Sequence, residues 1–182
     1  IAASGDLGYI TGPWEIRRSA NENAVAFGHY LTVWKLQPEG AWKVALDNGV
    51  SHRRVEPPAV VASLPLVSQI APEAEPGKAQ AALDALKNAD LAELNYADHA
   101  IVLREGAVPE RGKLSRILPL KVQPQGAHLS KSADFGYTYG MAETLPSESA
   151  SVSFFNYVRI WKRDATGSWR LEVDMLSEAP KP

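Results

Sequence analysis

The sequence predicts an α+β protein built on antiparallel sheet, in which a three-stranded β-meander occurs twice. Three observations predict this fold class. A block of strand-like sequence near the start recurs about 128 residues later. The recurring blocks are rich in β-branched and aromatic residues and contain Gly-bearing hairpin turns. Between them lies a segment whose apolar residues fall at helical spacing.

The first strand block extends over residues 4–12 and recurs at 132–140, an offset of 128 residues. A second block, 30–35, recurs at 157–162 with an offset of 127. The second offset relates three further identical pairs: Gly40 and Gly167, Trp42 and Trp169, and Asp47 and Asp174. Over 4–15 and 30–47 the copies are identical at 12 of 30 positions, where chance gives roughly two or three. The sequence therefore predicts an internal duplication.

Each copy is expected to form strands joined by tight turns. In the second copy, residues 152–161 are β-branched and aromatic, and 169–175 alternate apolar with polar side chains, which is the period of a half-buried strand. Residues 162–168 are the expected hairpin turn. The first copy repeats this pattern with strands at 31–36 and 42–46.

The region between the copies has a different character. Residues 55–77 carry five prolines and are expected to form a linker. Residues 78–94 are rich in Ala and Leu at helical spacing and predict a helix, with a break at 88–90 as a second possibility. The following segments are predicted in order as a strand, a loop and a short helix: 100–103, 104–112 and 113–118.

Residues 96–113, Tyr-Ala-Asp-His-Ala followed by a strand and a Gly/Pro loop, resemble the signature of SnoaL-like (DUF4440-like) domains of the NTF2-like superfamily. Residues 132–140 and 161–169 resemble the central and penultimate strands of such domains. The resemblance implies a cone, a curved antiparallel sheet wrapped around helices, with a second partial copy at the N-terminus. The domains implied are 1–54 (β-meander half of a first copy), 55–77 (linker) and 78–182 (complete domain).

The first copy lacks the helical part that covers the sheet in this family. Trp34, Trp42 and Val44 are therefore expected to need cover, because buried apolar surface stabilises by about 25 cal/mol per Å². Two sources are open: an N-terminal segment ahead of Ile1, or helices from a second chain.

Composition limits the partners. The formal net charge is −2 and the pI is about 6.1, so nothing favours nucleic-acid binding. The longest apolar run, 57–65, is too short to insert into a membrane. The chain has no cysteine, which excludes disulfides and thiolate chemistry. No signal peptide is visible, and a bacterial periplasmic or secreted location stays open.

Arg104 is the leading candidate for ligand binding. The resemblance implies that this position faces the cone and, in the ketosteroid-isomerase branch, carries the proton-shuttling carboxylate. Arginine stays protonated near neutral pH and cannot replace that base, but it suits a carboxylate, sulfate or phosphate. The alternative is a surface arginine paired with Glu105 or Glu110.

Two residues are candidate catalytic bases. His99 lies near the cone mouth by resemblance and has a near-neutral reference pKa; the alternative is a residue favoured by a helix C-terminus. Asp174 is the other. Strand alternation separates it from Leu171 and Val173 and predicts that it faces away from that apolar set.

Aromatic residues complete the candidate ligand-binding set. Alternation puts Tyr137 and Tyr139 on one face of their strand, and Tyr157 and Trp161 on one face of the next. With Tyr96 they are candidates to line a pocket. The alternative for the strand aromatics is packing in a core or a dimer interface.

The function these residues favour is small-molecule binding, with an anionic ligand expected, or a scaffold role without catalysis. The alternatives are an isomerase, dehydratase or cyclase acting in the cone, and a dimerisation module without a ligand. Whether the chain is an enzyme is left open, with binding favoured. We expect no metal, since the four histidines show no ligand spacing, and no cofactor. A pseudo-dimer within the chain or a homodimer is expected.

Overall fold

The computed structural model of the protein describes residues 1–54, 71–112, 119–145 and 152–181. These residues form nine strands and one helix. In chain order the elements are β1 (Leu7–Ile16), β2 (Ala26–Leu36), β3 (Trp42–Ser51), α1 (Pro76–Leu91), β4 (Tyr96–Arg104), β5 (Glu110–Arg111), β6 (Leu120–Leu129), β7 (Phe135–Thr144), β8 (Phe154–Arg163) and β9 (Trp169–Glu178).

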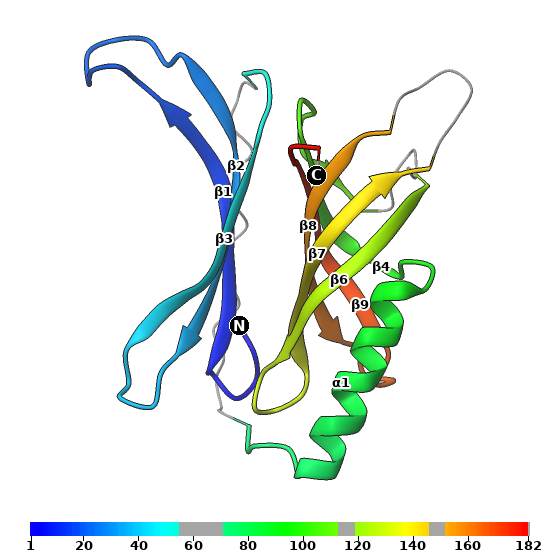
Figure 1. Ribbon diagram of the computed structural model, residues 1–182. Helices are drawn as coiled ribbons and strands as arrows, with labels where there is room; N and C mark the ends of the chain where they lie inside the picture. The colour runs from blue at the N-terminus through cyan, green and yellow to red at the C-terminus, as the bar shows by residue number, and fades with distance from the viewer. Residues whose placement is uncertain (55–70, 113–118, 146–151, 182) are drawn as a thin grey trace.

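The strands form two sheets. β1, β2 and β3 make a three-stranded sheet in chain order, and the other six make a sheet in the order β5-β4-β9-β8-β7-β6. Neighbours are antiparallel except β4 and β9, which are parallel. Figure 1 shows three layers: the three-stranded sheet, the six-stranded sheet and α1 on its far side. The chain is thus mostly sheet with one helix, as the predicted α+β class requires.

The hairpins β1–β2 and β7–β8 have the same register. Leu7 pairs with Lys35 in the first hairpin. Their counterparts in the repeat, 128 and 127 residues later, are Phe135 and Lys162, and these two residues pair in the second hairpin. The same correspondence relates further pairs, among them Tyr9–Val33 with Tyr137–Ile160 and Gly12–Tyr30 with Gly140–Tyr157. Both recurring blocks are therefore strands that pair in the same way.

The third strand of each unit also pairs alike. The register between β2 and β3 shifts at Val33/Trp34, and that between β8 and β9 shifts at Ile160/Trp161. These places are 127 residues apart, which is the sequence offset. A bulge makes two residues of one strand oppose one of its partner and changes which side chains share a face. This shared bulge decides how the functional site is assembled.

The two sheets pack through one apolar cluster. It includes residues of both sheets that are almost fully buried: Leu31, Val33, Val50, Phe135, Ile160 and Met175. The rings of Tyr9 and Phe135 stack across the interface, with centroids 6.0 Å apart. This contact buries one face of each sheet and forms the larger core of the molecule.

A reciprocal set of hydrogen bonds closes the contact at one end of the two sheets. The hydroxyls of Ser4 and Ser132 lie 2.8 Å apart, and each accepts the backbone N–H of the other residue at 3.1 Å. Each hydroxyl also bonds the aspartate two positions later, Asp6 or Asp134. Those carboxylates accept backbone N–H groups across the contact, Asp134 from Ala3 and Asp6 from Lys131. Such reciprocity is typical of an isologous interface.

The opposite face of the six-stranded sheet is covered by α1. Ala82 and Leu86, one turn apart on the helix, are buried with Trp161, Trp169 and Leu171 of the sheet. Proline at the first helical turn suits the start of α1 because its missing N–H would have no partner there. The helix thus completes a second apolar core and carries its last turn over the middle of the sheet.

Several local predictions need correction. α1 runs without a break through 88–90, so the alternative of two helices is wrong. The strand after α1 begins at Tyr96, not at residue 100. The Tyr-Ala-Asp-His-Ala motif is part of β4, and Tyr96 already pairs with Leu171 of β9. Sequence reasoning missed β6, an edge strand with a bulge at Pro124/Gly126; an edge tolerates proline. Residues 55–70 and the predicted short helix at 113–118 lie outside the described residues.

Candidate functional site

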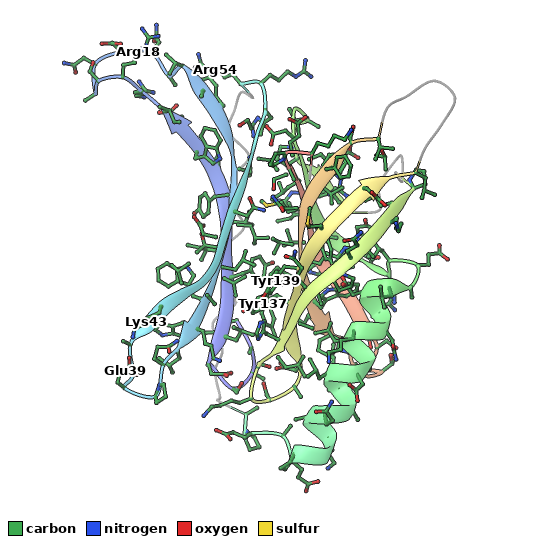
Figure 2. All side chains as sticks on the ribbon, in the orientation of Figure 1. Arg18, Glu39, Lys43, Arg54, Tyr137 and Tyr139 are labelled. Atoms are coloured by element: carbon green, nitrogen blue, oxygen red, sulfur yellow. The ribbon has the colours of Figure 1, made fainter. Side chains whose placement is uncertain are left out.

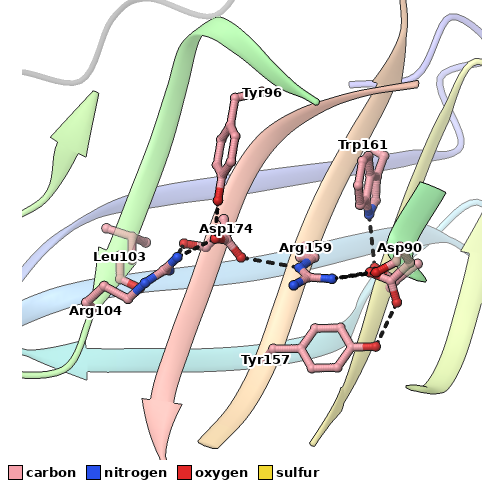
Figure 3. A network of polar contacts seen from close by, with 9 residues as sticks. Asp90, Tyr96, Leu103, Arg104, Tyr157, Arg159, Trp161 and Asp174 are labelled. Atoms are coloured by element: carbon pink, nitrogen blue, oxygen red, sulfur yellow. Dashed lines mark hydrogen bonds and ion pairs between the residues drawn. The ribbon is translucent and has the colours of Figure 1, made fainter. Parts of the chain in front are cut away.

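A chain of four charged side chains crosses the α1-covered face of the six-stranded sheet. It runs from Asp90 on α1 through Arg159 on β8 and Asp174 on β9 to Arg104 on β4 (Figure 3). Two carboxylates and two guanidinium groups alternate, so their formal charges cancel. Burying charge is tolerated only when each ion is paired and hydrogen-bonded, and this arrangement meets that condition.

The inner end of the network is formed at Asp90. Its carboxylate accepts hydrogen bonds from the hydroxyls of Thr138 and Tyr157, both at 2.7 Å, and from Nη1 of Arg159 at 2.9 Å. The indole N–H of Trp161 donates to Thr138 at 2.9 Å. All five of these side chains are almost completely buried. This end is therefore a closed polar core that fixes α1 on the sheet.

Arg159 joins the two carboxylates. Besides Asp90, its Nε donates to Asp174 at 3.4 Å, and its guanidinium lies 4.7 Å from the ring centroid of Tyr157. Burial by itself lowers the pKa of Arg159, but the negative charges of Asp174 and Asp90 outweigh it and raise that pKa above its ordinary value. Arg159 is thus a permanently charged centre of the network.

The outer end is formed by Arg104 and Tyr96 around Asp174. The Tyr96 hydroxyl donates to the Asp174 carboxylate at 2.8 Å, and Nη2 of Arg104 donates to the same oxygen. Nη1 of Arg104 donates to the carbonyls of Asp174 at 2.7 Å and Leu103 at 3.0 Å. The Arg104 side chain is 18% exposed, against 2% for Asp174 and 4% for Arg159. Arg104 is therefore where this charged network reaches the surface.

Electrostatics fix the protonation states at the outer end. Burial alone raises the pKa of Asp174, but the charges of Arg104 and Arg159 and the hydrogen bonds from Arg104 and Tyr96 hold it below its usual value of 3.8. Burial, followed by the Asp174 charge, raises the pKa of Tyr96. Near neutral pH, Asp174 is consequently an ionised acceptor and Tyr96 a neutral donor.

The bulge between β8 and β9 brings Asp174 into this network. Leu171 belongs to the α1-side core, whereas Val173 belongs to the core between the sheets. The shift at Ile160/Trp161 lets Leu171 and Asp174 share one face although they are three residues apart. The prediction that Asp174 faces away from Leu171 is therefore wrong, since strict alternation ignores the bulge.

His99 is not brought to the network. Its side chain is 74% exposed and its Nε2 lies 2.8 Å from the carboxylate of Glu172. It lies in β4 and not at a helix C-terminus. Nor does Glu105 pair with Arg104 as the surface alternative requires, because its carboxylate accepts the backbone N–H of Ser51.

The four strand aromatics divide between two faces. Tyr137 and Tyr139 point toward the three-stranded sheet (Figure 2) and pack in the core between the sheets. Tyr157 and Trp161 lie on the α1 side and are fully buried. The structure thus brings Tyr157 and Trp161 together with Arg104 and Tyr96 in one network, and separates Tyr137 and Tyr139 from it.

Sequence reasoning missed Asp90 and Arg159. Asp90 lies four residues after Leu86 and eight after Ala82, which is the spacing of one helix face. A carboxylate on that apolar face indicates a buried polar partner. Arg159 interrupts the apolar and aromatic stretch 157–161 of β8, at the position where the first copy has Thr32. A charged residue among apolar neighbours on a central strand indicates a buried partner.

The described residues contain no group of three or more His, Asp or Glu side chains placed to hold a metal ion. None of their helices is long and apolar enough to cross a membrane.

Comparison with known proteins gives a limited likeness. No family model matches the chain, and no curated protein matches it. Several solved structures are similar in part, and two of them serve as examples. One is a ketosteroid isomerase-like protein from Erwinia carotovora atroseptica, 17% identical, covering 58% of this chain and 96% of that one, with a TM-score of 0.42. The other is a putative ketosteroid isomerase from Shewanella frigidimarina, 16% identical, covering 54% and 87%, with a TM-score of 0.34.

Proposed function

We propose that this chain is a non-catalytic binding scaffold with an NTF2-like, SnoaL-like domain over residues 78–182, and that a small anionic ligand is held at Arg104. The observation that carries the proposal is the partial exposure of Arg104 at the end of an otherwise buried network. Its hydrogen bonds to the described residues use three of its five N–H donors. Donors are therefore left for a ligand carboxylate.

A binding role fits the network better than proton transfer. A general base must be able to take up a proton near the working pH, but Asp174 is buried and its pKa is lowered by two arginines. His99, the other candidate base, is bonded to Glu172 outside the network. An enzyme of the isomerase, dehydratase or cyclase class would need a proton acceptor at the network, and neither residue supplies one there.

We further propose that residues 1–54 are a partial second copy of the same domain and that the two copies form a dimer-like contact within one chain. The shared register of the β1–β2 and β7–β8 hairpins supports this. So does the reciprocal bonding of Ser4 and Ser132. In this proposal residues 1–54 supply a rigid backing for the strands that carry Arg104 and Asp174.

Calorimetric titration with acetate, succinate and benzoate tests the binding role. Wild-type protein should bind at least one of them, and Arg104→Met should weaken that binding by about tenfold or more, because hydrogen bonds to charged groups contribute roughly 1.5–3 kcal/mol. Arg104→Lys should be intermediate, since lysine keeps the charge but not the planar fork. Circular dichroism should show that both variants stay folded, because Asp174 keeps Arg159 and Tyr96.

Arg170→Met is the matched control. Arg170 is also on the six-stranded sheet and also paired with an aspartate, Asp164, but outside the network. Its loss should leave carboxylate binding unchanged. Equal binding by wild type and Arg104→Met, or an equal loss in Arg170→Met, would mean that the anion is attracted by surface charge and that Arg104 is no anchor.

A further inference from the structure

The outer face of the three-stranded sheet matches, position by position, the face that α1 covers on the other sheet. Under the shared register and bulges, eight positions correspond: Ile10 with Thr138, Trp14 with Ala142, Tyr30 with Tyr157, Thr32 with Arg159, Trp34 with Trp161, Trp42 with Trp169, Val44 with Leu171 and Asp47 with Asp174. We call the first member of each pair the outer face. All eight counterparts are buried.

The described residues cover the outer face only in part: Thr32 is buried, but three of the large apolar side chains are exposed. Trp42 is 40% exposed, Val44 50% and Ile10 39%, whereas Trp169 and Leu171 in the corresponding places are 6% and 0% exposed. The face also holds three of the five tryptophans of the chain. A contiguous exposed apolar surface of this kind marks an interaction site, and aromatic residues are enriched at the centres of interfaces.

We propose that the outer face binds an amphipathic α-helix of a partner protein, seated as α1 is seated on the six-stranded sheet. On that sheet Ala82 and Leu86 meet Trp161, Trp169 and Leu171. Their counterparts are the same residue at two of the three positions, Trp34 and Trp42, and the smaller Val44 at the third. The partner helix therefore presents small and branched aliphatic side chains one turn apart. α1, the helix of the described part of the chain, is already held on the other sheet by Asp90.

Charge complementarity defines the next turn of the partner helix. On the six-stranded sheet the strand supplies a cation, Arg159, and the helix supplies the carboxylate of Asp90. On the outer face the short Thr32 replaces the arginine and donates to Asp47 at 2.5 Å. Asp47 thus has a hydroxyl partner where Asp174 has two guanidinium groups. A partner helix in this place neutralises the Asp47 charge with a lysine or arginine at the position equivalent to Asp90 of α1.

The same charge argues against a second copy as the occupant. The eight residues of the outer face include one carboxylate and no cation. Two such faces packed together would bury two Asp47 carboxylates without a positive partner, which is unfavourable in a desolvated interface. A cationic helix removes that cost.

A stapled peptide with the sequence of residues 76–95 of this chain and the substitution Asp90→Lys is the probe. Added to ¹⁵N-labelled protein, it should shift the indole N–H signals of Trp34 and Trp42 and leave those of Trp161 and Trp169 in place. The unsubstituted peptide should bind about tenfold more weakly, because it places a carboxylate near Asp47. In Asp47→Asn protein that difference between the peptides should disappear.

Val44→Glu should abolish peptide binding, and Val25→Glu is its matched control. Both valines are about half exposed, but Val25 lies in the β1–β2 connection, off the outer face. No shift of Trp34 and Trp42, or unchanged binding by Val44→Glu, would overturn the proposal. Sedimentation of the free protein checks the other occupant: a dimer that Val44→Glu dissociates and Val25→Glu does not would identify a second copy and refute the helix.

Discussion

Asp174→Asn should lower the free energy of unfolding by about 3–5 kcal/mol, the usual cost of removing one partner from a buried ion pair. The substitution conserves shape but leaves Arg104 and Arg159 with a single remaining carboxylate, that of Asp90, which pairs with Arg159 and not with Arg104. Urea unfolding followed by circular dichroism measures the change.

The same variant should alter the acid limb of stability. The pKa of Asp174 is lower in the folded chain than its ordinary value of 3.8. Its contribution is therefore present above pH 3.8 and is lost as the pH falls through the lower folded-state pKa. In Asp174→Asn that part of the acid dependence should be missing, so the two proteins should converge in stability at low pH.

Asp47→Asn is the control for this comparison. Asp47 occupies the matching position on β3 but is exposed and bonded to the hydroxyl of Thr32. Its substitution should change stability by about 1 kcal/mol or less. If Asp174→Asn were as mild as Asp47→Asn, Asp174 would not be a buried centre of the charged network.

Trp169→Ala should destabilise the chain by about 3–5 kcal/mol, as truncation of large core side chains does. Trp169 is 6% exposed and packs beneath α1 with Leu86 and Leu171. Trp42→Ala, at the matching position of the first sheet, should cost about 1 kcal/mol, because Trp42 is 40% exposed. Chemical denaturation of both variants gives the two values.

The contrast between the two tryptophans is the informative quantity. A large difference indicates that α1 covers one sheet face while the other stays open to a partner. Equal losses of several kcal/mol would mean that the outer face is already packed in the free chain, and equal losses below 1 kcal/mol would mean that neither residue lies in a core.

Much of the fold could be predicted because the repeat carries strong local signals. Gly40 and Gly167 recur at the hairpin position and both have positive φ, 83° and 84°, which glycine adopts without strain. Trp42 and Trp169 recur at the first position of the third strand. Turn residues and aromatic spacing are retained in both copies, so the sequence predicts both meanders. It does not predict β6, because Pro124 is unusual in a strand and is tolerated there only because β6 lies at the sheet edge.

The site could be predicted only in part. The sequence indicates Arg104 through its place after the Tyr96 motif, and it indicates Asp174, the partner of Arg104, through the repeat. The pairing itself was hidden by the bulge, which reverses the face that alternation assigns to Asp174. Asp90 comes from a distant helix, and no spacing within the sequence indicates that it meets Arg159. Long-range packing decides that contact.

The binding role of Arg104 is tested most directly by its own side-chain signal. The Nε–Hε resonance of Arg104 is followed by NMR while succinate is added at constant ionic strength, so that screening does not change. We predict a saturable shift of Arg104, with the resonance of Arg170 unmoved. A shift that never saturates, or one that Arg104 and Arg170 share equally, would contradict an anion site at the end of the buried network.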